Sequence, residues 1–252
     1  MGKLLNDIEK YWTNRAEGYS QININQLHSE RKLMWKNTLQ KVFPQGNPSD
    51  IKVLDIGTGP GFFSIILAEL GYDVTAVDYT EAMLAKAKAN ARELQAKIKF
   101  KRMDAQNLDF ADNVFDVIVT RNLTWVLENP TKAYNEWYRV LKKGGMLLNF
   151  DANWYMHLFD MEKRKAYESD RFQVSKNQLN DHYTSTDVNE MERIAKEMPL
   201  SPIKRPEWDI KVLTKKGFDS VKVDENIWQH VWNHEEKINY ASTPMFLIQA
   251  YK

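Results

Sequence analysis

Three glycines at two-residue spacing follow an acidic residue in the stretch Asp55-Ile56-Gly57-Thr58-Gly59-Pro60-Gly61. Glycine has no side chain to hold a ligand away from the backbone, and it readily adopts a positive φ. The mostly apolar residues 51–56 predict a strand before this turn, and residues 62–70 predict a helix after it, ending at Gly71. A glycine turn between a strand and a helix lets main-chain atoms approach a nucleotide-like ligand, so the chemistry predicted here is cofactor binding.

A second acidic residue lies where nucleotide-binding folds place one. Residues 73–77 predict the next strand, and Asp78 follows it, 21 positions after Gly57. A carboxylate at this point can accept hydrogen bonds from two ribose hydroxyls. A dinucleotide-binding turn has the spacing G-x-G-x-x-G, whereas this one is G-x-G-x-G, which disfavours a nicotinamide cofactor.

Strands and helices continue to alternate along the chain, which predicts a parallel sheet with helices on both faces. The further strands expected are 98–101, 114–120, 146–150, 220–227 and 245–251, and the further helices are 80–91, 131–141 and a closing helix from 208. From 155 to about 204 the pattern gives way to charged residues. An insertion of this length between core elements predicts several helices with a functional role.

This order of elements indicates one domain, spanning 1–252, with additions to its core. The cofactor-binding core is expected at 46–155 and the closing helix and strands at 208–252. The N-terminal segment 1–45 and the insertion 156–207 are expected to form helical lids over the carboxyl ends of the strands.

Composition narrows the classes of substrate and chemistry that are expected for this chain. The 252 residues include 35 basic and 34 acidic side chains, a formal charge of +1, which argues against a nucleic-acid substrate. The absence of cysteine excludes disulfides and thiolate chemistry. No apolar run is long enough for a membrane span, and the N-terminus does not look like a signal peptide, so a cytoplasmic protein is expected. The 8 Trp, 11 Tyr and 11 Phe suit an apolar or flat ligand.

Residues 51–151 and the closing strands resemble the class I S-adenosylmethionine-dependent methyltransferases, in the branch that includes the ubiquinone and menaquinone methyltransferases. The segments that carry the resemblance are the glycine turn, Val77-Asp78, Asp104-Ala105, Phe115-Asp116-Val117-Ile118 and Arg139-Val140-Leu141-Lys142-Lys143-Gly144-Gly145. The resemblance implies an α/β, Rossmann-like, doubly wound sheet of seven mostly parallel strands with an antiparallel C-terminal hairpin. It also implies S-adenosyl-L-methionine as the cofactor.

The resemblance further implies which residues bind that cofactor. The methionine part would lie against Gly57, Thr58, Gly59 and Gly61, with its ammonium held by Asp55, directly or through water, and its ribose held by Asp78. The adenine would pack against Tyr79 and Met83 and have its edge read by Asp104 and Ala105. Asn122 would lie near the sulfonium, and Tyr19, in an aromatic N-terminal helix, would cover the cofactor. Asp104 as a turn cap, Met83 as helix core and Tyr19 as an ordinary helix edge remain alternatives.

A sulfonium already activates its methyl group, so the enzyme mainly has to align an acceptor. An oxygen or amine acceptor of high pKa would need a base, and Asp151 and His157 are the candidates because they follow the fifth strand. Trp125, Asn153 and Tyr155 are expected to contact the acceptor, since ligands of such sheets bind beyond the strand ends. Packing beneath the insertion is the alternative for this group.

The leading hypothesis is methyl transfer to a small-molecule acceptor. RNA or protein methylation, a nicotinamide oxidoreductase and a noncatalytic cofactor-binding module are the alternatives. The Asn/Asp-Pro-Pro-aromatic tetrapeptide of adenine-specific DNA methyltransferases is absent after the fourth strand. The pattern Trp228-x-His230-x-Trp232-x-His234 lacks a third metal ligand and favours aromatic packing, so no metal is expected.

Overall fold

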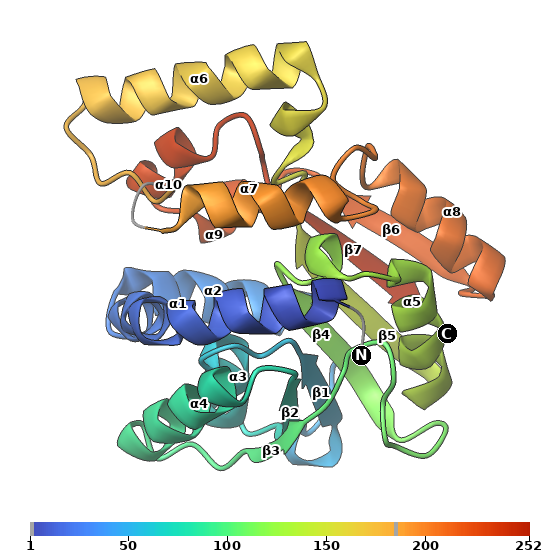
Figure 1. Ribbon diagram of the computed structural model, residues 1–252. Helices are drawn as coiled ribbons and strands as arrows, with labels where there is room; N and C mark the ends of the chain where they lie inside the picture. Colours follow the sequence, from blue (N-terminus) through green and yellow to red (C-terminus); the bar gives the residue numbers. More distant parts are fainter. Residues whose placement is uncertain (1–2, 184–185) are drawn as a thin grey trace.

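The computed structural model describes residues 3–183 and 186–252, which contain a seven-stranded sheet of order β3-β2-β1-β4-β5-β7-β6 (Figure 1). β7 runs antiparallel to its neighbours β5 and β6, and the pairs from β3 to β5 are parallel. The predicted fold class is therefore confirmed. The strands are β1 Lys52–Ile56, β2 Asp73–Asp78, β3 Lys99–Arg102, β4 Phe115–Arg121, β5 Leu141–Asp151, β6 Ser220–Asp224 and β7 Phe246–Tyr251.

Helices cover both faces of this sheet because successive strand residues point to opposite sides. Val53 of β1 belongs to one apolar cluster, with Trp35 of α2 (Glu30–Val42) and α3 (Phe62–Glu69). Leu54, the next residue, belongs to a second cluster formed with α5 (Pro130–Val140) and α8 (Glu207–Lys216). A strand buried on both faces has no polar side, which explains its nearly continuous apolar sequence.

The remaining helices are α1 Lys3–Leu27, α4 Glu81–Glu93, α6 Met161–Lys176, α7 Val188–Glu197, α9 Trp228–Val231 and α10 His234–Asn239, with short 3₁₀ turns at Pro48–Asp50, Thr124–Val126 and Met156–Leu158. Of these helices, α4 packs on β2 and β3, and α1 contributes to the wall of residues beyond the carboxyl ends of the strands. α1 lies between α4 and α7 and contacts both (Figure 1). A third apolar cluster joins Ile8 and Tyr11 of α1 to Trp125 and to Ile194 of α7. Within the described residues, no helix combines the length and apolar character needed to cross a membrane.

Two details differ from the expectation. Lys142 to Gly145 were expected to end a helix, but α5 ends at Val140 and these residues already belong to β5, where Gly144 donates its N–H to the carbonyl of Lys252. The closing strands are antiparallel as expected, yet α9 and α10 lie between them, so their connection is not a tight hairpin turn.

Candidate functional site

A cavity lies at the carboxyl ends of β1, β2 and β4, between the sheet and the helices α1 and α7. Its wall is contributed by the turn after β1, by the end of β2, by residues that follow β2, β3, β4 and β5, by α1, and by His182, Tyr183, Thr186, Met191 and Tyr240. This is the edge at which open α/β sheets bind ligands. Eleven of the predicted site residues line it: Tyr19, Gly57, Gly59, Asp78, Tyr79, Met83, Asp104, Ala105, Asn122, Trp125 and Tyr155.

The glycine turn presents its backbone to the cavity at Gly57 and Gly59. Both have positive φ, +67° and +54°. A Cβ added at Gly57 would lie 2.8 Å from Cδ1 of Leu123, another residue of the wall. Gly61, by contrast, does not line the cavity: a Cβ there would meet Cβ of Ala87 at 3.3 Å, so this glycine lets α3 and α4 approach each other. Thr58 is also buried outside the lining.

Asp55 stabilises the turn from within. Its carboxylate is buried outside the cavity lining, and Oδ2 accepts hydrogen bonds from Oγ1 of Thr58 at 2.7 Å and Oγ of Ser64 at 2.5 Å. Burial raises the pKa of Asp55, and the two hydroxyl groups oppose that rise. The geometry therefore gives Asp55 contacts within the turn and no direct route to a ligand in the cavity.

Asp78 lies in the wall at the end of β2. Oδ2 accepts the N–H of Gly59 at 2.9 Å and Oδ1 accepts the N–H of Thr80 at 2.8 Å. Burial raises the pKa of Asp78 to about 6, although both amides act to lower it. A carboxylate accepts more than two hydrogen bonds, so these contacts leave acceptor capacity for hydroxyl donors of a ligand.

Beyond Asp78 the wall has the shape and chemistry of a site for a flat polar ring. The guanidinium of Arg102 lies over the Tyr79 ring, 5.3 Å from its centre, and the Met83 side chain is buried in α4. Asp104 accepts the N–H of Gln106 at 2.9 Å, which fixes the loop that carries Ala105. Aromatic faces, a thioether and a loop amide are the groups that hold a nucleobase by packing and by its edge.

Asn122 connects this half of the cavity to the aromatic half. It has a left-handed backbone, with φ +57°, and its carbonyl accepts Nε1–H of Trp125 at 2.9 Å. Its side-chain Oδ1 is buried without a hydrogen-bond partner among the described residues. An unpaired buried acceptor is unfavourable, and a donor on a bound ligand would satisfy it. This orphaned atom, together with the glycine turn and Asp78, fits an adenosine-type cofactor with a charged amino group.

Asp151, one of the two candidate bases, holds the fold together instead of lining the cavity. Its side chain is fully buried, and Oδ2 accepts hydrogen bonds from Nη1 of Arg205 at 2.6 Å and from the backbone N–H of Trp125 at 3.1 Å. Arg205 also forms two bonds to Asp209, at 2.9 and 2.8 Å. Asn153 accepts the N–H of Arg205 at 3.0 Å and donates to its carbonyl at 2.8 Å. The structure therefore assigns Asp151 and Asn153 to an anchor for the residues around Arg205.

His157, the other candidate base, is also outside the cavity lining. Its ring stacks on Tyr167 with centroids 4.1 Å apart, and Nε2 lies 3.6 Å from Oε1 of Glu192, too far for a hydrogen bond. Burial lowers the pKa of His157, while Glu192 acts to raise it. Neither expected base lines the cavity.

Several wall residues were not among the predicted site residues. Trp12 and Arg15 of α1 line the cavity with Tyr19, and they recur at helical spacing, which is a usable signal. His182, Tyr183 and Tyr240 carry no local motif and are brought to the wall by long-range packing, whereas Trp154 lies next to the predicted Tyr155 in the segment that follows β5. No three His, Asp or Glu side chains of residues 3–183 and 186–252 gather closely enough to hold a metal ion. His230 and His234 are exposed.

Comparison with known proteins finds similarity to methyltransferases. The family model for a methyltransferase domain matches residues 54–149. A demethylmenaquinone methyltransferase of Bacteroides fragilis is 32% identical over 157 residues, 58% of this chain and 60% of the relative. Across the first three curated relatives, the match covers 45% to 60% of the relative's length.

Solved structures share the fold. A candidate S-adenosyl-L-methionine-dependent methyltransferase from Methanococcus maripaludis superposes with a TM-score of 0.61 and 22% identity, over 95% of this chain and 93% of the other. Phosphoethanolamine N-methyltransferase 2 of Haemonchus contortus, in complex with S-adenosyl-L-methionine, has a TM-score of 0.58 and 19% identity, over 85% and 51%. Both identities are low, so these two similarities concern the fold.

The strand order, the glycine turn tied to Asp78 and the matching methyltransferase domain agree with one another. Residues 54–149 match a methyltransferase domain, and the seven-stranded sheet has the strand order of the class I S-adenosylmethionine-dependent methyltransferase fold.

Proposed function

We propose that this protein transfers the methyl group of S-adenosyl-L-methionine to a small-molecule acceptor enclosed between the sheet and the helices α1 and α7. The observation that carries the proposal is the continuity of one cavity. Its wall runs from the glycine turn and Asp78 to a group of aromatic side chains, among them Trp12, Trp125 and Tyr155. A donor and an acceptor can therefore lie side by side in a single space.

In this proposal each cofactor-binding residue contacts a different part of S-adenosyl-L-methionine. The Asp78 carboxylate accepts the ribose hydroxyls, and Gly57 and Gly59 let the backbone approach the methionine part. Tyr79 and Met83 pack on the adenine, whose edge meets Asp104 and the loop at Ala105. Asn122 and Tyr19 lie toward the reacting end. All of these residues line the cavity, which supports the assignment.

The aromatic end of the cavity supports a flat, mainly apolar acceptor. Trp125 and Tyr155 face each other with ring centroids 4.8 Å apart, and Trp154 packs on Tyr240 at 5.4 Å. The bound methyl donor supplies an activated methyl group, so the protein has to orient the acceptor and exclude water. Orientation alone lowers a barrier by about 7–11 kcal/mol in favourable systems.

Enclosure favours a small acceptor over a polymer. α1 and α7 pack together through Tyr11, Met191 and Ile194 across the top of the cavity. The near-zero net charge of the whole chain offers no general attraction for RNA. Curated relatives are named for methylation of demethylmenaquinone and of phosphatidylethanolamine, which supports a small-molecule acceptor here.

Calorimetric titration tests the cofactor half of the proposal. S-adenosylmethionine and S-adenosylhomocysteine should each bind at about micromolar strength, near −8 kcal/mol, and NAD should bind negligibly. Tighter binding of NAD would overturn the assignment. A panel of phenols, amines, thiols and carboxylates, followed by release of S-adenosylhomocysteine, then tests the transfer itself.

A further inference from the structure

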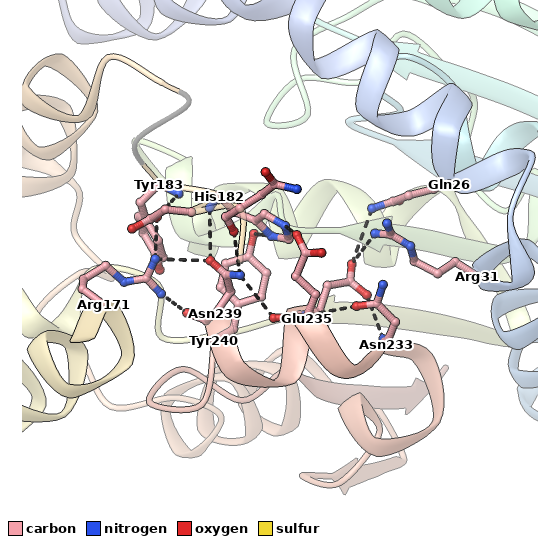
Figure 2. A network of polar contacts seen from close by, with 12 residues as sticks. Gln26, Arg31, Arg171, His182, Tyr183, Asn233, Glu235, Asn239 and Tyr240 are labelled. Carbon is pink, nitrogen blue, oxygen red and sulfur yellow. Dashed lines mark hydrogen bonds and ion pairs between the residues drawn. The ribbon is translucent and has the colours of Figure 1, made fainter. Parts of the chain in front are cut away.

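Three polar side chains form a connected chain that ends at the cavity. The hydroxyl of Tyr240 lies 3.0 Å from Nδ1 of His182, and Nε2 of His182 lies 2.8 Å from Oε1 of Glu235 (Figure 2). Tyr240 and His182 line the cavity, whereas Glu235 of α10 lies outside the lining. The donor-binding residues make no use of this chain of contacts.

The chemistry of the three groups fixes the direction of the hydrogen bonds. An ionised carboxylate only accepts, so Nε2 of His182 carries the proton that Glu235 binds. Nδ1 of the neutral ring is then an acceptor, and the Tyr240 hydroxyl must be its donor. The oxygen of Tyr240 keeps its lone pairs for a donor on another molecule. The arrangement can therefore draw a proton from the cavity toward His182.

Tyr240 lies close to the donor-binding wall. Its pKa is raised by burial first and then by neighbouring groups that include Tyr183, Glu236 and Tyr19. Tyr19 in turn approaches the glycine turn, since a Cβ at Gly59 would lie 3.6 Å from its Cε1. A raised pKa keeps Tyr240 protonated, so it passes a proton on in a concerted step and does not act as a stored phenolate.

Charge at this end of the cavity suits a hydroxyl acceptor better than a cationic amine. Among the described residues, the carboxylates of the wall are Asp78, Asp104 and Glu128, which follow β2, β3 and β4 on the donor side. The side chains around Tyr240 are aromatic: Trp154 at 5.4 Å, Trp232 at 5.4 Å and Tyr183 at 5.9 Å between ring centres. Such a surface accommodates a ring that carries a hydroxyl group.

We propose that Tyr240 is a catalytic residue that accepts the proton of a ring hydroxyl on the acceptor, with His182 and Glu235 as positioning residues; this rests on the proposed methyl transfer. The acceptor oxygen forms a bond to the methyl carbon, and the carbon–sulfur bond breaks with its electron pair left on sulfur. The acceptor proton moves to Oη of Tyr240, while the Tyr240 proton moves to Nδ1 of His182. The resulting imidazolium is balanced by Glu235.

Residues around His182 also hold α6 and α10 together, so the test has to separate a catalytic role of Tyr240 from a structural role of this region. The backbone N–H of His182 donates to Oδ1 of Asn239 at 3.1 Å, and Arg171 of α6 bonds to Asp181 at 2.5 Å and to Asn239 at 3.2 Å (Figure 2). The titratable and charged groups facing the chain of contacts are Tyr19 of α1, Arg171 of α6, Asp181 and Tyr183 before α7, and Glu236 of α10.

The probe is 4-nitrophenol, whose neutral and ionised forms absorb at different wavelengths. It is titrated with pH while bound to the 252-residue chain saturated with S-adenosylhomocysteine. Phenolate formation should be assisted by proton transfer toward His182. We expect Tyr240→Phe and His182→Asn to raise the pH of half-ionisation of the bound phenol by about one unit or more, and Glu235→Gln to raise it less.

Two further variants separate catalysis from structure. Arg171→Gln removes contacts that hold Asp181 and Asn239 together, so it should lower the unfolding temperature, while it should shift the ionisation of the bound phenol less than Tyr240→Phe does. Tyr138→Phe makes the same chemical change at a half-buried site outside the cavity lining, where the hydroxyl donates to the carbonyl of Gly217, and it should leave the ionisation of the bound phenol unchanged.

The proposal is overturned if Tyr240→Phe leaves the ionisation pH unchanged, if Arg171→Gln shifts it equally, or if the protein saturated with S-adenosylhomocysteine does not bind the phenol. Failure of the underlying methyltransferase assignment would look different. In that case S-adenosylhomocysteine itself would not bind the unmodified protein, before any phenol is added.

Discussion

The carboxylate of Asp78 accepts the backbone N–H of Gly59 at 2.9 Å and thereby ties the end of β2 to the glycine turn after β1. Asp78 is the last residue of β2 and Gly59 lies in the turn after β1, yet both line the cavity. One ionisable group therefore both positions the turn and lines the cavity. Its protonation state should be visible in cofactor affinity.

Affinity for S-adenosylhomocysteine should rise with pH between about 5 and 7. The pKa of Asp78 is near 6, and ribose hydroxyls donate to the ionised form. As pH falls through that value, the carboxylate takes up a proton and loses acceptor capacity, so affinity should fall by up to about tenfold per unit below 6. Calorimetry across this range measures the effect, and Asp78→Asn should abolish the pH dependence. A flat profile for the unmodified protein would contradict the prediction.

In the cofactor-free protein, the contribution of Asp78 to stability should change with pH in the opposite direction and fall as pH rises. The folded-state pKa lies above the ordinary value of 3.8, so the native state retains the proton longer than the unfolded state does. The contribution of this group to the free energy of unfolding is therefore greatest below about pH 4 and declines as pH rises to about 6. Asp78→Asn should remove that part of the decline, as urea unfolding at several pH values would reveal.

Gly57→Ala should damage both folding and cofactor binding. The residue has φ +67°, which an alanine adopts only with strain, and the added Cβ would lie 2.8 Å from Leu123. We expect a loss of about 1–3 kcal/mol in the free energy of unfolding and a measurable loss of affinity for S-adenosylhomocysteine.

Gly18→Ala is the matched control for that variant. Gly18 lies exposed in α1 with nothing within 4 Å of an added Cβ, so alanine should stabilise the helix by about 0.5–1 kcal/mol. Urea unfolding and calorimetry distinguish the two substitutions. Equal effects at Gly57 and Gly18 would mean that the turn tolerates a side chain.

Asp151→Asn should lower the free energy of unfolding. The substitution breaks one of the two buried ion pairs of Arg205, which stays paired with Asp209, so the loss in the free energy of unfolding should stay below the about 3–5 kcal/mol of a charge left fully unpaired. Glu207→Gln, which breaks an exposed ion pair with Lys204, should change the free energy of unfolding by less than about 1 kcal/mol. If Asp151→Asn kept full stability and lost turnover alone, Asp151 would be a base after all.

The contrast between Asp78 and Asp151 shows how far the sequence alone can lead. Asp78 could be predicted because strand, glycine turn, helix and second strand follow one another within 27 residues, from Lys52 to Asp78, and their spacing fixes the geometry. Asp151 also follows a strand and was expected to face the acceptor. Its partner Arg205, however, is 54 positions away, inside the insertion without regular pattern. A buried ion pair of that kind leaves no local signal.

The contacts of His182 with Tyr240 and Glu235 escaped prediction for a similar reason. Tyr240 is 58 positions from His182, and neither belongs to a motif. The aromatic N-terminal helix was recognisable because Trp12, Arg15 and Tyr19 recur at helical spacing, so one face of α1 could be expected to meet the cofactor. Local periodicity is visible in a sequence, whereas packing between distant loops is not.

α1 should become more protected from hydrogen exchange when cofactor binds. Residues 12–19 place Trp12, Arg15 and Tyr19 in the cavity wall, and the helix packs on α4 and α7. A ligand beneath it adds contacts to these side chains and raises the free energy of local opening. α5 contributes no described residue to the wall and serves as the internal control, so its exchange should stay constant. Exchange measured with and without S-adenosylhomocysteine decides the point: equal rates in α1 would make it a fixed part of the fold, and slower rates would identify it as the element that closes over the ligand.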